Sequence, residues 1–272
     1  MDCFVGIDIG STSIKIVLVD ENGTLVSHST NPTGGRFHKN ALAALDTLLV
    51  ESALHPSDVK YMVSTGYGRK LFKEADESLS EITANGIGAN YAGGVNGKVR
   101  TIINIGGQDL KVIHLDDDGQ VCNFVMNDKC AAGTGRFLEM TARNLEADVD
   151  ELGAMHLAAD GLPLTINSTC TVFAESEIIS LLAQGNSPQR IAAGVHYSIA
   201  RRVVRLAKRI GIEEMVLFDG GPALNKGLVA ALEDELMCAV QVPDVPEITT
   251  AIGAAIQARE AYSFHKAREA NG

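Results

Sequence analysis

The chain has 272 residues, of which 46% are hydrophobic, and its 34 acidic and 23 basic side chains give a formal net charge of −11. This composition is typical of a globular protein with a full hydrophobic core, and the negative charge argues against a nucleic acid or an anionic membrane as partner. The chain starts without a basic, apolar leader, and no apolar run approaches the roughly 18 residues that span a bilayer, so we expect a cytoplasmic location.

The first predicted elements form a unit that occurs twice. Residues 6–23 read GIDIGSTSIKIVLVDENG and residues 102–119 read IINIGGQDLKVIHLDDDG, so Gly10 and Gly106 lie 96 residues apart. Each copy predicts a buried strand, a tight glycine turn, a second strand and a further turn into a third strand. Two such turns that faced each other would direct backbone N–H groups at one phosphate chain from both sides. The repeat therefore predicts a nucleotide held between two related halves.

Carboxylates and hydroxyls gather at these two turns. Asp8 and Asp109 are placed where a Mg²⁺-bound phosphate would lie, whereas a hairpin that serves only as scaffold, the alternative interpretation, needs no carboxylate there. Gln108 or Asp109 is expected to orient the water that attacks the terminal phosphate. The residues expected to bind the nucleotide at the turns are Asp8, Gly10, Ser11, Thr12, Lys15, Gly106, Gly107, Gln108 and Asp109.

The remaining elements alternate between helices and strands. The pattern predicts helices over residues 40–54, 78–91, 135–144, 173–184 and 187–210, helices that begin at residues 224 and 249, and strands over 59–64, over 215–218 and near 240. Gly220 and Gly221 follow a strand and are expected near the adenosine, with an ordinary strand-to-helix turn as the alternative. We expect an α/β protein whose lobes span residues 1–95 and 96–248, with the last helix, 249–272, returning to the first lobe.

Five cysteines without an export signal favour reduced thiols or metal ligands over disulfides. Cys3, Cys122 and Cys238 fall in strand-like or helix-like stretches and are expected to be small buried hydrophobes. Cys130 and Cys170 each precede a predicted helix, whose N-terminus stabilises a thiolate. Two cysteines do not complete a Cys₄ site, but a twofold dimer supplies four. For each cysteine taken alone, a packed thiol without a metal is the alternative.

Five segments resemble a known family. Residues 8–12 (DIGST), 65–69 (TGYGR), 105–109 (IGGQD), 127–137 (NDKCAAGTGRF) and 168–177 (STCTVFAESE) resemble the activator ATPases of 2-hydroxyacyl-CoA dehydratases. ATP-binding subunits of benzoyl-CoA reductase and reductases of double-cubane cluster proteins are similar. The resemblance implies the acetate and sugar kinase, chaperone and actin fold, with two ribonuclease-H-like lobes, ATP or ADP and Mg²⁺ in the cleft, and Gly133 among the nucleotide-binding residues. It also implies a homodimer with one [4Fe–4S] cluster bound by Cys130 and Cys170 of each chain.

The activity that the resemblance implies is ATP-dependent, low-potential, one-electron transfer. Reduced ferredoxin or flavodoxin would supply the electron, and an iron–sulfur protein, either a 2-hydroxyacyl-CoA dehydratase or a double-cubane protein, would accept it. Family members usually carry Asp at the position of Asn104 and His at that of Asn85, which leaves Asp8 and Asp109 as the expected acidic partners of Mg²⁺. A non-catalytic nucleotide sensor and a small-molecule kinase of the same fold are the alternatives, and a kinase would have no need of the two cysteines.

Overall fold

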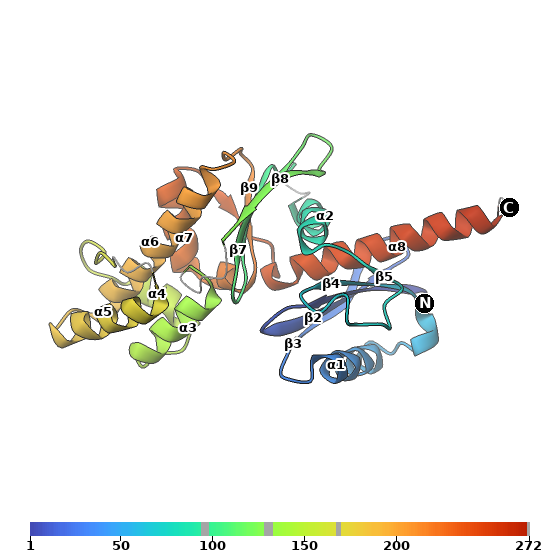
Figure 1. The fold of residues 1–272 in the computed structure, drawn as a ribbon, viewed down its shortest axis with the longest axis horizontal. Helices are drawn as coiled ribbons and strands as arrows, with labels where there is room; N and C mark the ends of the chain where they lie inside the picture. Colours follow the sequence, from blue (N-terminus) through green and yellow to red (C-terminus); the bar gives the residue numbers. More distant parts are fainter. Residues whose placement is uncertain (94–97, 128–132, 167–169, 271–272) are drawn as a thin grey trace. The chain divides into compact units, whose positions relative to one another are not determined.

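The two copies of the repeat open two five-stranded sheets. In the computed structural model, which describes residues 1–93, 98–127, 133–166 and 170–270, the strand orders are β3-β2-β1-β4-β5 and β10-β9-β6-β7-β8. The first sheet belongs to a unit made of Met1–Lys98, Asp116–Val121 and Glu247–Gly272, and the second to a unit made of Val99–Leu115 and Cys122–Pro246 (Figure 1).

The sheet of the first unit combines an antiparallel meander with two parallel strands. β1 (Cys3–Ile9), β2 (Ser13–Asp20) and β3 (Leu25–Pro32) form the meander, while β4 (Val59–Gly66) runs parallel to β1 and the short β5 (Glu77–Ser78) runs parallel to β4. Every residue of β1 is buried. A central strand that is covered on both faces has no solvent side, which explains the apolar run at its start.

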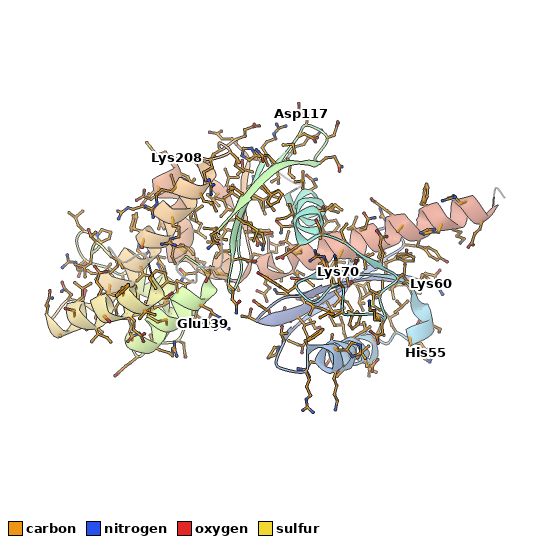
Figure 2. All side chains as sticks on the ribbon, viewed as in Figure 1. His55, Lys60, Lys70, Asp117, Glu139 and Lys208 are labelled. Carbon is orange, nitrogen blue, oxygen red and sulfur yellow. The ribbon has the colours of Figure 1, made fainter. Side chains whose placement is uncertain are left out.

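Helices cover both faces of this first sheet. α1 (Phe37–Glu51) packs Leu45 and Leu48 against Ile7 and Ile16 of the sheet. α8 (Thr249–Ala270) lies on the opposite face, where it contacts β1, β2 and β4 (Figure 1). The 3₁₀ turn η1 (Pro56–Asp58), capped by the side chain of His55, leads into β4 (Figure 2). The last helix is thus an integral part of the first unit.

α2 (Glu81–Gly93) crosses α8 at very short range. A Cβ added to Gly253 would overlap the carbonyl oxygen of Ala84, so only glycine allows this approach of the two backbones. Asn85 is buried at the same crossing, and its Nδ2 donates to Thr250 Oγ1 at 3.0 Å. The departure from the family pattern at position 85 therefore concerns the packing of α2 on α8.

The second unit repeats the strand plan of the first. β6 (Thr101–Ile105) pairs antiparallel with β7 (Leu110–Leu115) and parallel with β9 (Val216–Asp219), β10 (Val240–Gln241) runs parallel to β9, and β8 (Val121–Met126) is the edge strand beside β7. β6 therefore has the neighbours in this sheet that β1 has in the other, which confirms the predicted duplication as a structural one.

Five α-helices complete the described part of the second unit. They are α3 (Gly135–Asn144), α4 (Glu151–Leu157), α5 (Thr171–Ala183), α6 (Pro188–Ala207) and α7 (Lys226–Leu236), and the 3₁₀ turns η2 (Gly221–Leu224) and η3 (Pro246–Ile248) precede α7 and α8. Ile191, Val195, Ile199 and Val203 form the buried stripe of α6. Within the described residues, no helix has the length and apolar character that a membrane span requires.

The predicted burial of three cysteines is correct for only one of them. Cys3 is buried, whereas Cys122 is exposed and Cys238 is half-buried. Cys122 lies on the edge strand β8, where a strand-like apolar pattern does not imply coverage on both faces. Cys238 lies beyond the end of α7, since this helix stops at Leu236 and Met237 adopts a left-handed conformation.

Candidate functional site

The first glycine turn leaves backbone donors unused. The amide of Gly10 donates to the carbonyl oxygen of Ser13 at 3.0 Å and closes a two-residue loop of Ser11 and Thr12. Thr33 fixes this loop from outside, because its hydroxyl donates to the carbonyl oxygen of Gly10 at 2.8 Å. In the described part of the chain, the amides of Ser11 and Thr12 have no acceptor. Such a loop offers two N–H groups to an anion.

A buried carboxylate lies directly before this turn. Asp8 is 5% exposed, and its Oδ2 lies 3.4 Å from Nζ of Lys15, its cross-strand partner. Thr65 is its partner on the parallel strand β4, and the buried hydroxyl of Thr65 has no hydrogen-bond partner among the described residues. Buried polar atoms without partners are rare in native proteins. An ionisable carboxylate beside an unused hydroxyl fits the oxygen ligands that hydrated Mg²⁺ prefers.

The second turn has the same hydrogen bond and the same free donors. The amide of Gly106 donates to the carbonyl oxygen of Asp109 at 2.9 Å, which closes a loop of Gly107 and Gln108. Neither loop amide has an acceptor in the portion of the chain that the structure describes. The carboxylate of Asp109 pairs with Lys111, at 3.0 Å between Oδ2 and Nζ, and is therefore fixed beside the turn.

The carbonyl groups of the second turn are bound by the start of α3. The amide of Gly135 donates to the carbonyl oxygen of Gly106 at 2.9 Å, and the amide of Arg136 donates to that of Gly107 at 3.2 Å. The N-cap residue, Thr134, makes no capping bond with its side chain. The turn thus takes the place of a helix cap, and turn and helix are joined by two hydrogen bonds.

In the second unit, three hydrogen-bonded polar side chains occupy the place that corresponds to Asp8 and its neighbours in the first unit. Asn104 holds the position that Asp8 has in the first copy, and its Nδ2 donates to Asp219 Oδ1 at 2.7 Å. Its Oδ1 accepts from Lys111 Nζ at 3.3 Å. Asp219, which is fully buried, holds the position on β9 that Thr65 has on β4. The second unit therefore keeps a carboxylate, but on the neighbouring strand.

Asp219 is not among the residues that the sequence predicts for the site. A second resemblance between the halves could have revealed it, because each of the parallel strands β4 and β9 leads to a glycine with positive φ: Gly66, the last residue of β4, at 81°, and Gly220, the residue after β9, at 90°. A Cβ on Gly66 would lie 2.7 Å from the carbonyl oxygen of Ile9, and one on Gly220 would overlap that of Ile105. Gly221 meets no such contact, since its Cβ position is open.

The predicted cluster ligands are only partly described. Cys130 lies outside the described residues. Cys170 is the N-cap residue of α5, with an exposed thiol and no capping bond from its side chain. An exposed, free thiol at a helix N-terminus fits a metal ligand. The described residues contain no group of three or more metal-ligating side chains, and a site divided between two chains would not form such a group within one chain.

Gly133, predicted to bind the nucleotide, lies at the start of the segment that enters α3. Its φ is 93°, and a Cβ there would lie 2.7 Å from Cδ of Arg202 on α6. Packing against Arg202 is therefore one reason for a glycine at this position. The role of Gly133 toward a nucleotide stays a prediction.

The chain is similar to known ATPases over almost its whole length. Residues 5–258 match the BadF/BadG/BcrA/BcrD ATPase family. The activator of lactoyl-CoA dehydratase from Anaerotignum propionicum is 45% identical over 258 residues, which are 94% of this chain and 97% of that protein. The solved structure of the activator of the 2-hydroxyisocaproyl-CoA dehydratase from Clostridium difficile, with bound ADPNP, is 41% identical, covers 98% of this chain and 97% of its own, and has a TM-score of 0.91.

A more distant neighbour bears on the fold alone. The ROK family glucokinase from Streptomyces griseus, solved with glucose and AMPPNP, is 15% identical, covers 95% of this chain and 99% of its own, and has a TM-score of 0.61. The predicted fold of two ribonuclease-H-like lobes, as in sugar kinases and actin, is confirmed.

Proposed function

Because the chain belongs to the BadF/BadG/BcrA/BcrD ATPase family, we propose that it hydrolyses ATP to activate an iron–sulfur partner such as a 2-hydroxyacyl-CoA dehydratase. The observation that carries the ATPase part is the duplicated turn, whose four loop amides have no acceptor in the described chain. The activator part is supported by similarity, over almost the whole chain, to activators of lactoyl-CoA and 2-hydroxyisocaproyl-CoA dehydratases.

In this proposal, both turns bind the phosphates of one ATP molecule. The loop amides donate to phosphate oxygens, and Lys15 adds positive charge. Asp8 holds hydrated Mg²⁺ with help from the unused Thr65 hydroxyl. The proposed nucleotide ligands are Asp8, Gly10, Ser11, Thr12, Lys15, Gly106, Gly107, Gln108 and Gly133, with Gly220 and Gly221 near the adenosine. The proposed lobes are residues 1–95 and 96–248, with 249–272 in the first lobe, and the two compact units of the structure support them except at Asp116–Val121, which belongs to the first unit.

Hydrolysis requires a water molecule oriented toward the terminal phosphate, and we assign this role to Gln108 and Asp109. Gln108 is half-buried in the loop of the second turn. The ion pair with Lys111 holds the Asp109 carboxylate in one place, which suits a group that positions water. Neither residue needs to form a covalent bond with the phosphate.

We further propose that the protein is a homodimer with one [4Fe–4S] cluster, bound by Cys130 and Cys170 of each chain. A bound cluster supplies a one-electron carrier. Cys170 lies at the N-terminus of α5, where the positive end of the helix dipole favours a bound group of negative charge. Val172 and Phe173, next to it, are 68% and 70% exposed, which is apolar surface that a second copy would cover. Reduced ferredoxin or flavodoxin is the proposed electron donor.

The hydrogen bonds between the second turn and α3 support coupling of ATP to electron transfer. α3 begins shortly after Cys130, and its first amides are bound to Gly106 and Gly107. A change of the turn upon hydrolysis therefore displaces the helix that follows this cysteine. Each 100 mV of potential gained by one electron requires about 2.3 kcal/mol from the difference between nucleotide states.

The proposal is tested with ATP binding, ATP hydrolysis and partner activation measured on the same variants. Gly107→Val should abolish ATP binding by calorimetry, because a side chain blocks approach to the turn amides. Gly35→Val is the matched control, since a Cβ at Gly35 meets open space. A Gln108→Ala, Asp109→Asn double variant should bind ATP but lose hydrolysis and activation of a purified 2-hydroxyacyl-CoA dehydratase. Undiminished ATP binding in the Gly107 variant would contradict the assigned phosphate site.

The acceptor is tested separately from the nucleotide chemistry. The reduced, ATP-loaded protein should activate a dehydratase under anaerobic conditions and should need ATP hydrolysis to do so. Activation of a double-cubane protein in its place would change the acceptor but keep the electron-transfer proposal. Sugar-dependent ATP consumption without any electron transfer would establish the kinase alternative and refute the activator proposal.

A further inference from the structure

Two segments of the first unit carry a concentration of positive charge. Residues 33–40 lead into α1 and residues 66–74 follow β4, and together they hold five basic side chains and one acidic side chain. The whole chain has the opposite balance, with 34 acidic and 23 basic residues. The basic surface, as we call it, consists of Arg36, Lys39, Arg69, Lys70 and Lys73.

The two segments pack against each other, so their charges share one surface. The rings of His38 and Phe72 lie 5.7 Å apart. A Cβ at Gly68 would lie 3.5 Å from Cδ2 of Phe37. His38 Nε2 also lies 3.0 Å from both carboxylate oxygens of Glu74, and this contact occupies the one carboxylate that the two segments contain.

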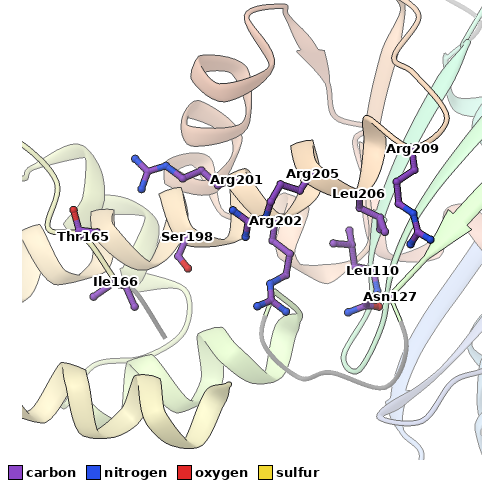
Figure 3. Close-up of a pocket in the computed structure, with 10 residues that line it drawn as sticks. All are labelled: Leu110, Asn127, Thr165, Ile166, Ser198, Arg201, Arg202, Arg205, Leu206 and Arg209. Carbon is purple, nitrogen blue, oxygen red and sulfur yellow. Dashed lines mark hydrogen bonds between the residues drawn. The ribbon is translucent and has the colours of Figure 1, made fainter. Parts of the chain in front are cut away.

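Most of these positive charges have no partner in the fold. Four of the five side chains are exposed and make no ion pair or side-chain hydrogen bond with a described residue. They are Arg36, Lys39, Lys70, which Figure 2 labels, and Lys73. In contrast, Arg201, one of the arginines along α6 (Figure 3), is paired, since its Nε donates to Glu235 Oε1 at 2.9 Å. Unpaired like charges repel one another, so the basic surface does not stabilise the fold.

Two large apolar side chains project among these charges. Tyr67 is 62% exposed and Leu71 is 61% exposed, and both lie in the loop that carries Lys70. Exposed apolar side chains that lie close together mark interaction sites, and tyrosine and arginine are enriched at interfaces between proteins. A nucleic acid or an anionic membrane is an extended negative surface, which the acidic remainder of the chain would repel. A protein can present a limited acidic patch that matches five basic side chains.

The basic surface is hydrogen-bonded to the first glycine turn. The amide of Gly68 donates to the carbonyl oxygen of Ile9, next to the turn, at 3.0 Å. Asn40 Nδ2 donates to the carbonyl oxygen of Thr33 at 2.8 Å, and the hydroxyl of Thr33 donates to that of Gly10 at 2.8 Å. A change of the turn upon nucleotide binding therefore acts on both segments, and a partner bound to them would respond to the nucleotide.

We propose that the basic surface docks an acidic face of the iron–sulfur protein that the chain activates, with Tyr67 and Leu71 as apolar contacts. This inference rests on the proposed function, which couples ATP hydrolysis to the acceptor of the electron and not to its donor. A surface that is bonded to a phosphate-binding turn suits the acceptor for this reason.

The test is the dissociation constant of the complex with a purified 2-hydroxyacyl-CoA dehydratase, measured under anaerobic conditions with MgADPNP, which is not hydrolysed. A Lys39→Glu, Lys70→Glu variant reverses one charge in each segment and should weaken the complex at least tenfold. Both side chains are unpaired within the described chain, and a carboxylate is favourable in the first turn of a helix such as α1. This variant should therefore fold. Tyr67→Ala, Leu71→Ala, which removes no charge, should weaken the complex to a similar extent.

Lys266→Glu, Arg268→Glu is the matched control, since it makes the same change in net charge on exposed residues of α8. The ring of Tyr262 lies 5.5 Å from that of Phe4, near the start of β1, so this end of α8 is remote from the basic surface, which lies beyond the last residues of β1 and β4. The control should bind the dehydratase like the wild type. All variants should bind ATP like the wild type by calorimetry.

The possible outcomes separate docking from the other roles of a basic surface. Equal dissociation constants for the Lys39, Lys70 variant and its control would overturn the proposal, as would a wild type that does not bind the dehydratase. A loss of ATP affinity that accounts for the weaker complex would assign the surface to the nucleotide instead. Binding to phosphatidylserine vesicles that only the Lys39, Lys70 variant loses, with unchanged dehydratase binding, would establish a membrane surface. A wild type that binds the dehydratase without activating it would refute the proposed function, while the dissociation constants would still decide whether the basic surface docks it.

Discussion

Asn104 and Asp219 are joined across the parallel strands β6 and β9 by a hydrogen bond of 2.7 Å from Nδ2 to Oδ1. The corresponding residues of the first unit are Asp8 and Thr65, so the carboxylate and its neutral neighbour have exchanged strands between the two copies. Asp219 is fully buried and Asn104 is 8% exposed. An amide donor beside a buried carboxylate stabilises its charged form.

The first prediction concerns this pair. Asn104→Asp replaces a donor with a second carboxylate, and we expect a loss of about 1–3 kcal/mol in the free energy of unfolding at pH 7. The two carboxylates repel each other, and Lys111 Nζ, which lies 3.3 Å from Asn104 Oδ1 and is already paired with Asp109, offsets this repulsion only in part. The folded protein then binds a proton more readily, so the loss should shrink as the pH is lowered toward 5. Urea unfolding of the variant and the wild type at pH 7 and pH 5 measures this loss. A loss that is the same at both pH values would contradict the electrostatic explanation.

Gly220→Ala should destabilise the second unit. Its φ of 90° is unfavourable for alanine, and the new Cβ would overlap the carbonyl oxygen of Ile105. We expect a loss of about 1–3 kcal/mol. Gly221→Ala is the adjacent control, since its Cβ meets open space, and it should change unfolding by less than about 0.5 kcal/mol. Similar melting temperatures for both variants would argue against the strain.

The pair formed by the buried His196 and the half-buried His156 should make stability depend on pH. The two Nδ1 atoms lie 3.0 Å apart, and His196 Nε2 lies 3.1 Å from Asn225 Nδ2. Burial, and then the charge of His156, lower the pKa of His196 from 6.5 to about 3. The unfolded chain therefore binds a proton that the folded chain does not as the pH falls below 6.5. Binding of this proton does not affect the free energy of unfolding above pH 6.5, and it lowers that free energy progressively as the pH falls from 6.5 to about 3.

Urea unfolding at pH 7, 6 and 5 checks this dependence. Replacement of His196 by Gln should reduce the slope of stability with pH by up to about 1.4 kcal/mol per pH unit below pH 6. His28→Gln is the control, because His28 is exposed on β3. An unchanged slope in the His196 variant would mean that other groups cause any loss at acid pH.

Cys170→Ser should remove the proposed cluster, whereas Cys122→Ser should not. Both thiols are free and exposed in this structure, so exposure alone does not distinguish them, but only Cys170 begins a helix. We expect the anaerobically purified wild type to be brown, with about four irons per dimer as one cubane requires. The Cys170 and Cys130 variants should be colourless and dimerise more weakly, while still binding ATP. An intact reduced-cluster signal in electron paramagnetic resonance of either variant would exclude the bridged arrangement.

The parts of the fold that depend on local pattern could be predicted from the sequence. The hairpins around Gly10 and Gly106 and the start of α3 at Gly135 agree with the prediction because turn residues and periodicity are adjacent in the chain. The Asn104–Asp219 bond could not be predicted in this way, since it depends on which distant strand lies beside β6. The prediction that Cys122 is buried was wrong for a similar reason. The sequence pattern of β8 does not indicate that this strand lies at the edge of its sheet. The short α4 and β5 were missed.

The amides of Gly135 and Arg136 donate to carbonyl groups of another segment, at 2.9 and 3.2 Å. Most first-turn amides of helices face solvent or a side-chain cap, and exchange their hydrogens quickly. These two exchange only when the helix and the turn at Gly106 part. Their hydrogen–deuterium exchange rates therefore report, without any label, how often that turn opens, with and without a bound ligand.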